Sequence, residues 1–243
     1  MERISHPAGS IGPGRAAARG AGCKRLALQT ATMRHRIPRR ELSVRAGSLF
    51  TMTSNRPTPN PATAARLAQA ASLWTWTGQA RPSFAAEPHA GQESVWDYLR
   101  PPRLEPDTRE VIVRVGGVEI LRSTRALRLL ETASPPSWYL PLADAVSAAF
   151  VPAAGSSHCE WKGVARYWTI VAGGIRLERA AWSYDAPLAP YEALRGYVAL
   201  YPTDAECLVD GERVRPQDGG FYGGWVTDEI VGPWKGRPGS GGW

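Results

Sequence analysis

The chain has 243 residues and a formal net charge of +7, but the positive charge is confined to one end. Residues 1–60 contain 11 Lys or Arg and two acidic residues, whereas the remainder has 18 basic and 20 acidic residues. A basic tail on a near-neutral domain does not predict nucleic-acid binding by the folded part. No run of 18 apolar residues occurs, so the sequence also predicts no membrane partner.

Residues 1–60 are predicted to form a disordered basic extension, because they are rich in Gly, Ala, Arg and Pro without an apolar period. Their Arg-rich, acid-poor composition is also typical of a mitochondrial presequence, although several Pro and Gly residues would break its helix. We favour a third interpretation, in which the printed sequence is translated from an upstream start and Met52 is the real beginning. Met1, Met33 and Met52 all stay open as the true start, and we expect a cytoplasmic protein.

Residues 61–91 are expected to contain one short Ala-rich helix, over 62–73, followed by an extended arm. A single β-rich domain is predicted for residues 92–243. Three pairs of apolar runs are separated by Gly-Gly or Asp-Gly, the signal of a two-residue hairpin turn. The turns lie at Gly116-Gly117, Gly173-Gly174 and Asp210-Gly211. Three hairpins favour antiparallel sheet, interrupted by two short helices near 142–150 and 191–201.

The stretch Ser157–Ala172 is predicted to be one strand, and it carries the residues most suited to chemistry. Alternation along a strand would place Lys162 with His158 and Arg166 on one face, and Cys159 with Trp161 and Tyr167 on the other. Cys159 and His158 would then point apart, which disfavours a thiol–imidazole pair. We expect Cys159 to be either a small buried hydrophobe or a thiol in a pocket. Lys162 is either part of a solvated face or an anion-binding donor.

The cysteines at 23, 159 and 207 lack the paired spacing of a zinc site, so no metal is predicted and the cofactor stays unknown. Reduced conditions are the default for so few cysteines. Candidate ligand-binding residues are the aromatics and the lysine that could line a cleft: Trp161, Lys162, Tyr167, Trp182, Tyr184, Phe221, Tyr222 and Trp225. Candidate catalytic residues are Cys159 and Lys162.

Several motifs resemble one uncharacterised family, number 427 among the domains of unknown function. They are Gly91–Tyr98, Cys159 with Trp161-Lys162-Gly163, Ala165 and Tyr167, Ala181–Tyr184 with Pro187, and Gly219–Trp225. The stretch Gly78–Pro82 and the Gly-Trp ending resemble the actinobacterial branch. The resemblance covers about residues 76–243. It implies a β-tent-like fold, in which two antiparallel sheets meet at an angle and ligands bind in the cleft between them.

Many relatives with that fold hold zinc through two paired-cysteine motifs, which this chain lacks. The family also carries a nucleotidyltransferase-like label, but no carboxylate pair after a Gly-Ser motif supports it here. Three functions stay open. The first is binding of a small anionic or aromatic ligand in an aromatic-lined cleft, with or without a reaction. The second is a protein-interaction module without catalysis, and the third is a thiol redox enzyme using Cys159. The oligomeric state is not predicted.

Overall fold

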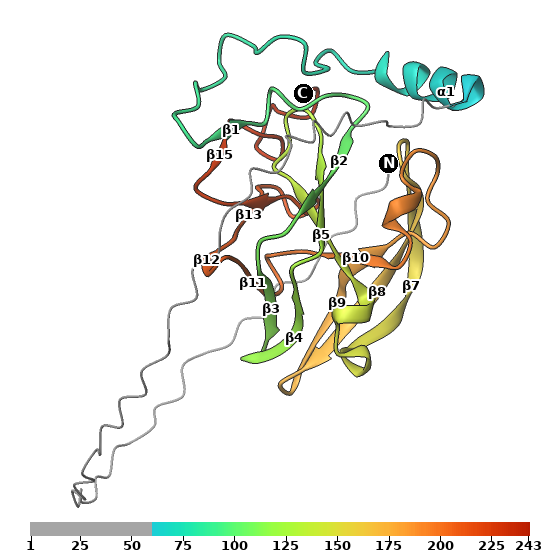
Figure 1. Ribbon diagram of the computed structural model, residues 1–243, viewed down its shortest axis with the longest axis vertical. Coiled ribbons are helices and arrows are strands. Elements are labelled where there is room, and N and C mark those ends of the chain that lie inside the picture. The colour runs from blue at the N-terminus through green and yellow to red at the C-terminus, as the bar shows by residue number, and fades with distance from the viewer. Residues whose placement is uncertain (1–59) are drawn as a thin grey trace, which may run out of the picture. The chain divides into compact units, whose positions relative to one another are not determined.

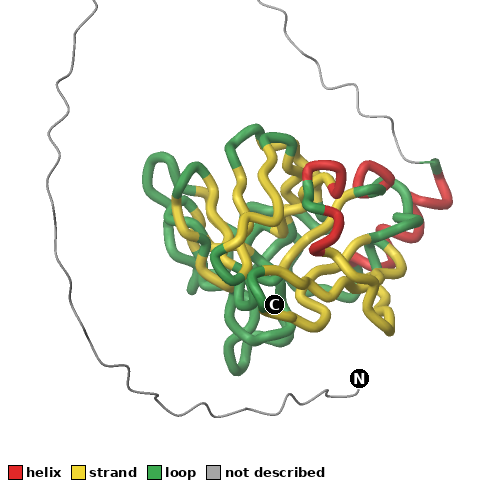
Figure 2. The backbone as a smooth tube through the Cα atoms, turned by 90° about the horizontal axis from the view of Figure 1, so that it is seen from below, coloured by secondary structure: helices red, strands yellow, loops and turns green. Residues whose placement is uncertain are grey.

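The computed structural model describes residues 60–243 of the chain. The expectations for residues 1–59, including the disordered extension, the presequence and the alternative starts, lie outside the described residues. Strands and loops make up most of the described part, and its helical segments are few and short (Figure 2). The prediction of a mainly β fold with antiparallel sheets is therefore confirmed.

Helix α1 spans Pro61–Ala71, close to the predicted range. The sequence explains where it begins, because the Asn60 side chain accepts a hydrogen bond from the Thr63 amide at 2.9 Å and Pro61 follows the cap. From α1 the chain runs across one end of the domain to the first strand (Figure 1). None of the helices in residues 60–243 is long and apolar enough to cross a bilayer.

The larger sheet has seven strands, and all neighbours in it are antiparallel. Their order across the sheet is β2 (Arg103–Asp107), β5 (Ala126–Leu130), β6 (Ser137–Pro141), β10 (Tyr197–Leu200), β9 (Ile175–Ser183), β8 (Gly163–Ala172) and β7 (Phe150–Cys159). Strand β7 is therefore an edge strand.

The smaller sheet has four antiparallel strands. Their order is β12 (Glu212–Arg213), β11 (Glu206–Val209), β3 (Val111–Val115) and β4 (Val118–Ser123). Two short pairs complete the fold, an antiparallel one of β13 (Arg215–Pro216) with β14 (Trp225–Val226) and a parallel one of β1 (Glu93–Ser94) with β15 (Ile230–Val231). All three predicted hairpins are present, as β3–β4, β8–β9 and β11–β12.

The two faces of the larger sheet bury different side chains. Alternate residues such as Leu140 and Val198 face the smaller sheet and share a core with Val113 and Cys207 of its strands. Their neighbours along the strands join a second cluster, in which half of the buried residues are aromatic and to which Leu67 and Ala70 of α1 also belong. Burial on both faces explains why the central strands β6 and β10 are nearly continuous apolar runs in the sequence.

The two patches expected to be helical contain only single 3-10 turns, at Leu142–Asp144, Ser147–Ala149 and Glu192–Leu194. In the second patch Gly196 adopts a φ of +80°, a left-handed conformation that ends the turn. Residues Tyr197–Leu200 then pair into the sheet as β10, because their apolar side chains are buried on both of its faces.

Candidate functional site

The predicted strand Ser157–Ala172 is wrong in one respect that changes the site. The chain reverses at Glu160–Lys162, so that β7 ends at Cys159 and β8 begins at Gly163 directly opposite it. Gly163 has a φ of +92°, and a Cβ atom there would lie 3.0 Å from the Leu188 side chain. Glycine therefore allows this reversal, which the alternation argument did not foresee.

The turn moves Lys162 from the solvated face to the aromatic cluster. Its side chain is 8% exposed, and its ammonium lies 5.7 Å from the centre of the Tyr184 ring. It also interacts with the hydroxyl of Tyr139 and lies near the Cys159 thiol. The expected grouping of Lys162 with His158 and Arg166 is thus incorrect, because strand alternation does not continue through a turn.

The other predicted aromatics of this region do come together. Trp161, Tyr167, Trp182 and Tyr184 are all buried in one cluster, and Cys159 packs against it. The Trp182 indole donates a hydrogen bond to the Tyr139 hydroxyl at 3.3 Å and lies 4.5 Å from Tyr201, centre to centre. Their predicted role as the walls of an open cleft stays a prediction.

The predicted residues of the glycine-rich loop separate from one another. Phe221 is 74% exposed and stands against Tyr222. Trp225 belongs to β14 instead, is fully buried, and stacks on Trp138 with 5.8 Å between ring centres. The loop nevertheless reaches the aromatic cluster, because a Cβ at Gly223 would lie 2.1 Å from the Trp182 ring.

Tyrosine hydroxyls surround Lys162, and burial raises the pKa of Tyr139, Tyr184 and Tyr191 above the ordinary value. These phenols are therefore neutral at physiological pH and keep their protons for donation. Burial opposes the charge of Lys162, but the nearby oxygens of Tyr139 and Tyr184 favour the ammonium more strongly. The pKa of Lys162 is accordingly raised. The site presents one cation and several O–H donors.

The use of lysine in this chain is a signal that the sequence prediction missed. Only three of the 29 basic residues are lysines, and the two that lie after residue 60, Lys162 and Lys235, are both buried. Lysine is almost never fully buried without a partner. The ion pairs found among residues 60–243 are made by arginines, so neither lysine is neutralised by direct contact with a described carboxylate.

Lys235 lies close to this region and was not predicted as a site residue. Its ammonium lies 3.7 Å from the centre of the Trp74 ring, and the guanidinium of Arg100 lies 4.1 Å from the same ring centre. Trp74 packs against the same aromatic cluster as Trp161. Desolvation, aided by the positive charge of Arg100, lowers the pKa of Lys235 to about 8.

Helix α1 covers the β7–β8 turn. The guanidinium of Arg66 donates hydrogen bonds to the carbonyl oxygens of Glu160 at 2.6 Å, Ala189 at 2.8 Å and Trp161 at 3.4 Å. Three bonds from one charged group to two separate loops fix the helix on the turn. The Lys162 cluster is therefore closed on this side by residues 61–75, which we call the cover segment.

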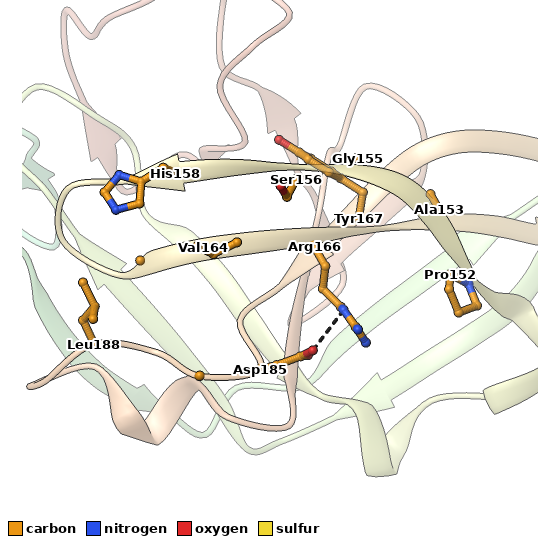
Figure 3. A pocket seen from close by; sticks show the side chains of 12 residues that line it. Pro152, Ala153, Gly155, Ser156, His158, Val164, Arg166, Tyr167, Asp185 and Leu188 are labelled. Carbon is orange, nitrogen blue, oxygen red and sulfur yellow. Dashed lines mark ion pairs between the residues drawn. The ribbon is translucent and has the colours of Figure 1, made fainter.

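The opposite face of the β7–β8 hairpin carries an open groove of about 680 Å³. Figure 3 shows Arg166 reaching from β8 toward Asp185, with which it forms an ion pair of 2.9 Å, while Tyr167 points to the other side of the strand. His158 and Leu188 also line it. Arg166 thus has a carboxylate partner in this groove, whereas Lys162 has no direct ion pair with a described carboxylate.

A redox role for Cys159 would need a second thiol as resolving residue, and Cys207 is the other cysteine of the described residues. Both cysteines of the described part are free. Cys207 is buried in the core between the two sheets, and burial raises the pKa of its thiol. A resolving cysteine needs an accessible thiolate. Among residues 60–243, no group of three or more His, Cys, Asp or Glu side chains is placed to hold a metal ion.

Residues 103–214 match the family model described as a domain of unknown function (DUF427). This range runs from β2 to β12 and contains Lys162, Tyr139 and Tyr184, whereas Trp74 and Lys235 lie outside it. No curated protein matches the chain. The resemblance to this family is confirmed, and the assignment to an actinobacterial branch stays a prediction.

Proposed function

We propose that this protein, whose residues 103–214 belong to the DUF427 family, binds a small anionic ligand at Lys162. The observation that carries the proposal is the burial of Lys162 among tyrosines without an ion pair to a described carboxylate. Buried charges in proteins are normally paired, because taking an ion out of water costs several kcal/mol. An anionic ligand group would supply the missing partner.

The neighbours of Lys162 suit an anion because they are donors. The Tyr139 hydroxyl already accepts a bond from Trp182, so its own proton can point to a ligand. Tyr184 lies within 6.4 Å of Tyr139, ring centre to ring centre, and its raised pKa keeps it protonated. Hydrogen bonds from O–H and N–H groups to a charged oxygen are among the strongest in proteins.

Native mass spectrometry of the whole protein, purified under mild conditions, tests this proposal. The expected result is a small adduct on the wild type that is absent from Lys162→Met. The matched control is Arg195→Met, which removes an exposed cation and should keep the adduct. An adduct that survives in Lys162→Met would contradict the assignment of the site.

Stability measurements extend the test to ligands that dissociate during purification. Inorganic phosphate, a minimal anion, should raise the free energy of unfolding of the wild type by about 2.7 kcal/mol at a hundred times its Kd. The same concentration should leave Lys162→Met unchanged, after correction for the general effect of salt on Arg195→Met. Equal stabilisation of all three proteins would count against a specific anion site.

A protein-interaction role is the second candidate, and one observation favours it. Among residues 60–243, strand β7 lies at the edge of the larger sheet, and its outer side could pair with a strand of another chain. Exposed Phe221 offers a separate apolar contact. A Val151→Lys variant on the exposed edge should abolish partner capture in this case and leave anion binding intact.

Three other expectations stay predictions. The cytoplasmic location is one, and the absence of nucleic-acid binding by the folded domain is another. The thiol redox role of Cys159 is the third, and it has the least support because Cys207 cannot readily form a thiolate. Rapid alkylation of Cys159 in the native protein would revive it.

A further inference from the structure

The Trp74 ring lies between two cationic side chains, Arg100 and Lys235, which would bind an anionic ligand more strongly than a neutral indole. It belongs to the cover segment, whereas Arg100 precedes β2 and Lys235 follows β15, so three distant parts of the chain meet here. Both cations lie over the same ring, at 4.1 and 3.7 Å from its centre. The ring supplies a cation–π contact but no negative charge.

The contacts of Trp74 leave polar groups unmatched. The indole nitrogen of Trp74 is buried and has no hydrogen-bond partner in the described structure, and the same holds for Trp161 in the same cluster. Arg100 is paired with Glu131 at 3.1 Å, but Lys235 makes no such pair with a carboxylate of the described residues. Unmatched buried donors destabilise the closed arrangement. Displacement of Trp74 by a ligand with acceptor atoms would therefore be favoured.

The charges around this place show an excess of positive charge. The carboxylate of Glu131 acts on both Lys162 and Lys235, and Lys235 also lies near the Glu160 carboxylate and the Arg100 guanidinium. Once the cover segment has moved away, the cations Lys162, Lys235 and Arg100 face the carboxylates of Glu131 and Glu160, and an excess of one positive charge is left for an anionic ligand to balance.

We infer that Trp74 is an internal substitute for the ligand, and that the site accepts a planar aromatic anion once the cover segment moves away. The aromatic ring of the ligand would replace the Trp74 ring over Arg100 and Lys235, and its anionic group would reach the buried ammonium groups. This inference rests on the proposed function and adds the ligand class and the element that gates entry. Movement is confined to residues before Trp76, because Arg100 holds the Trp76 carbonyl at 2.9 Å.

The test uses the full chain and phenyl phosphate, an aromatic dianion, measured by calorimetric titration. Trp74→Ala should bind phenyl phosphate about tenfold more tightly than the wild type, a difference of ~1.4 kcal/mol, because the competing ring is gone. The matched control is Leu73→Ala, which alters the neighbouring residue of the cover segment, 79% exposed, and should bind like the wild type. Adding Lys235→Met to Trp74→Ala should remove the gain.

Neutral phenol is the control for a ligand that merely fills the cavity left by Trp74→Ala, because it has the aromatic ring without the negative charge. An equal gain for phenol and phenyl phosphate in Trp74→Ala would overturn the inference, as would no gain for phenyl phosphate. Inorganic phosphate reports on the proposed function alone, since it has no ring to compete with Trp74. Its binding should depend on Lys162 and be the same in Trp74→Ala and the wild type, so the two ideas can fail separately.

Hydrogen exchange in the wild type gives a second test that needs no variant to fold. Saturating phenyl phosphate should increase amide exchange in residues 61–75, because the ligand displaces Trp74 and releases α1. Exchange in the β8–β9 hairpin should not increase. Unchanged or slower exchange of the cover segment on binding would overturn the gating role of Trp74.

Discussion

Replacement of Lys235 by methionine should stabilise the protein at neutral pH. The pKa of Lys235 falls from the ordinary 10.5 to about 8 in the folded protein, and each unit corresponds to ~1.36 kcal/mol. The desolvated ammonium thus costs at most about 3 kcal/mol at pH 7. The substitution also removes the cation–π contact with the Trp74 ring, which reduces the expected stabilisation by ~0.5–2 kcal/mol. We expect Lys235→Met to raise the free energy of unfolding by about 1–2 kcal/mol.

The pH dependence gives this prediction its sign. The folded protein loses the Lys235 proton at lower pH than the unfolded chain does, because its pKa is depressed. The cost is therefore complete below pH 8 and declines as the pH rises from about 8 toward 10.5. Urea unfolding of both proteins at pH 7 and pH 10 measures this, with Arg195→Met as an exposed control. The reasoning would be refuted if Lys235→Met were less stable than the wild type at pH 7, or if the stability difference between the two proteins were the same at pH 7 and pH 10.

Three further changes test the packing. Trp225→Ala should lower the free energy of unfolding in urea by about 3–5 kcal/mol, because the ring is fully buried. Phe221→Ala in the same loop region should change that free energy little, because Phe221 is exposed. Similar losses in the two variants would contradict the placement of Trp225. Gly223→Ala should shift the fluorescence of Trp182, since the new Cβ would lie 2.1 Å from that ring, and an unchanged spectrum would refute the contact. Cys207 should resist iodoacetamide at pH 8 until the protein unfolds, because burial raises the pKa of its thiol; rapid labelling of the native protein would show otherwise.

The fold was predictable where the sequence carries local signals. Each of the three dipeptide turns has glycine at a positive φ, and each joins the strands that its flanking apolar runs indicated. The β7–β8 turn was not predictable in this way. Its loop residues are Glu160, Trp161 and Lys162, and the only glycine follows them and reads as part of a strand.

The candidate site was only partly predictable, for a related reason. Neighbouring residues such as Trp161 and Lys162 were found because a motif placed them together. Tyr139 and Lys235 were missed, because they join the site through pairing and packing between segments far apart in the sequence. The scarcity of lysine was the one sequence signal for Lys235, and it becomes informative only when both lysines prove to be buried.

The central claim is that an anion binds at Lys162, and the small number of lysines allows a direct measurement. Protein labelled with carbon-13 at the lysine Cε gives three side-chain signals in a carbon–proton spectrum, which the Lys162→Met and Lys235→Met variants assign. On titration with inorganic phosphate, the account predicts a saturable shift of the Lys162 signal and no comparable shift of the Lys24 signal. A Lys162 signal that does not move, or that moves only in parallel with Lys24, would contradict it.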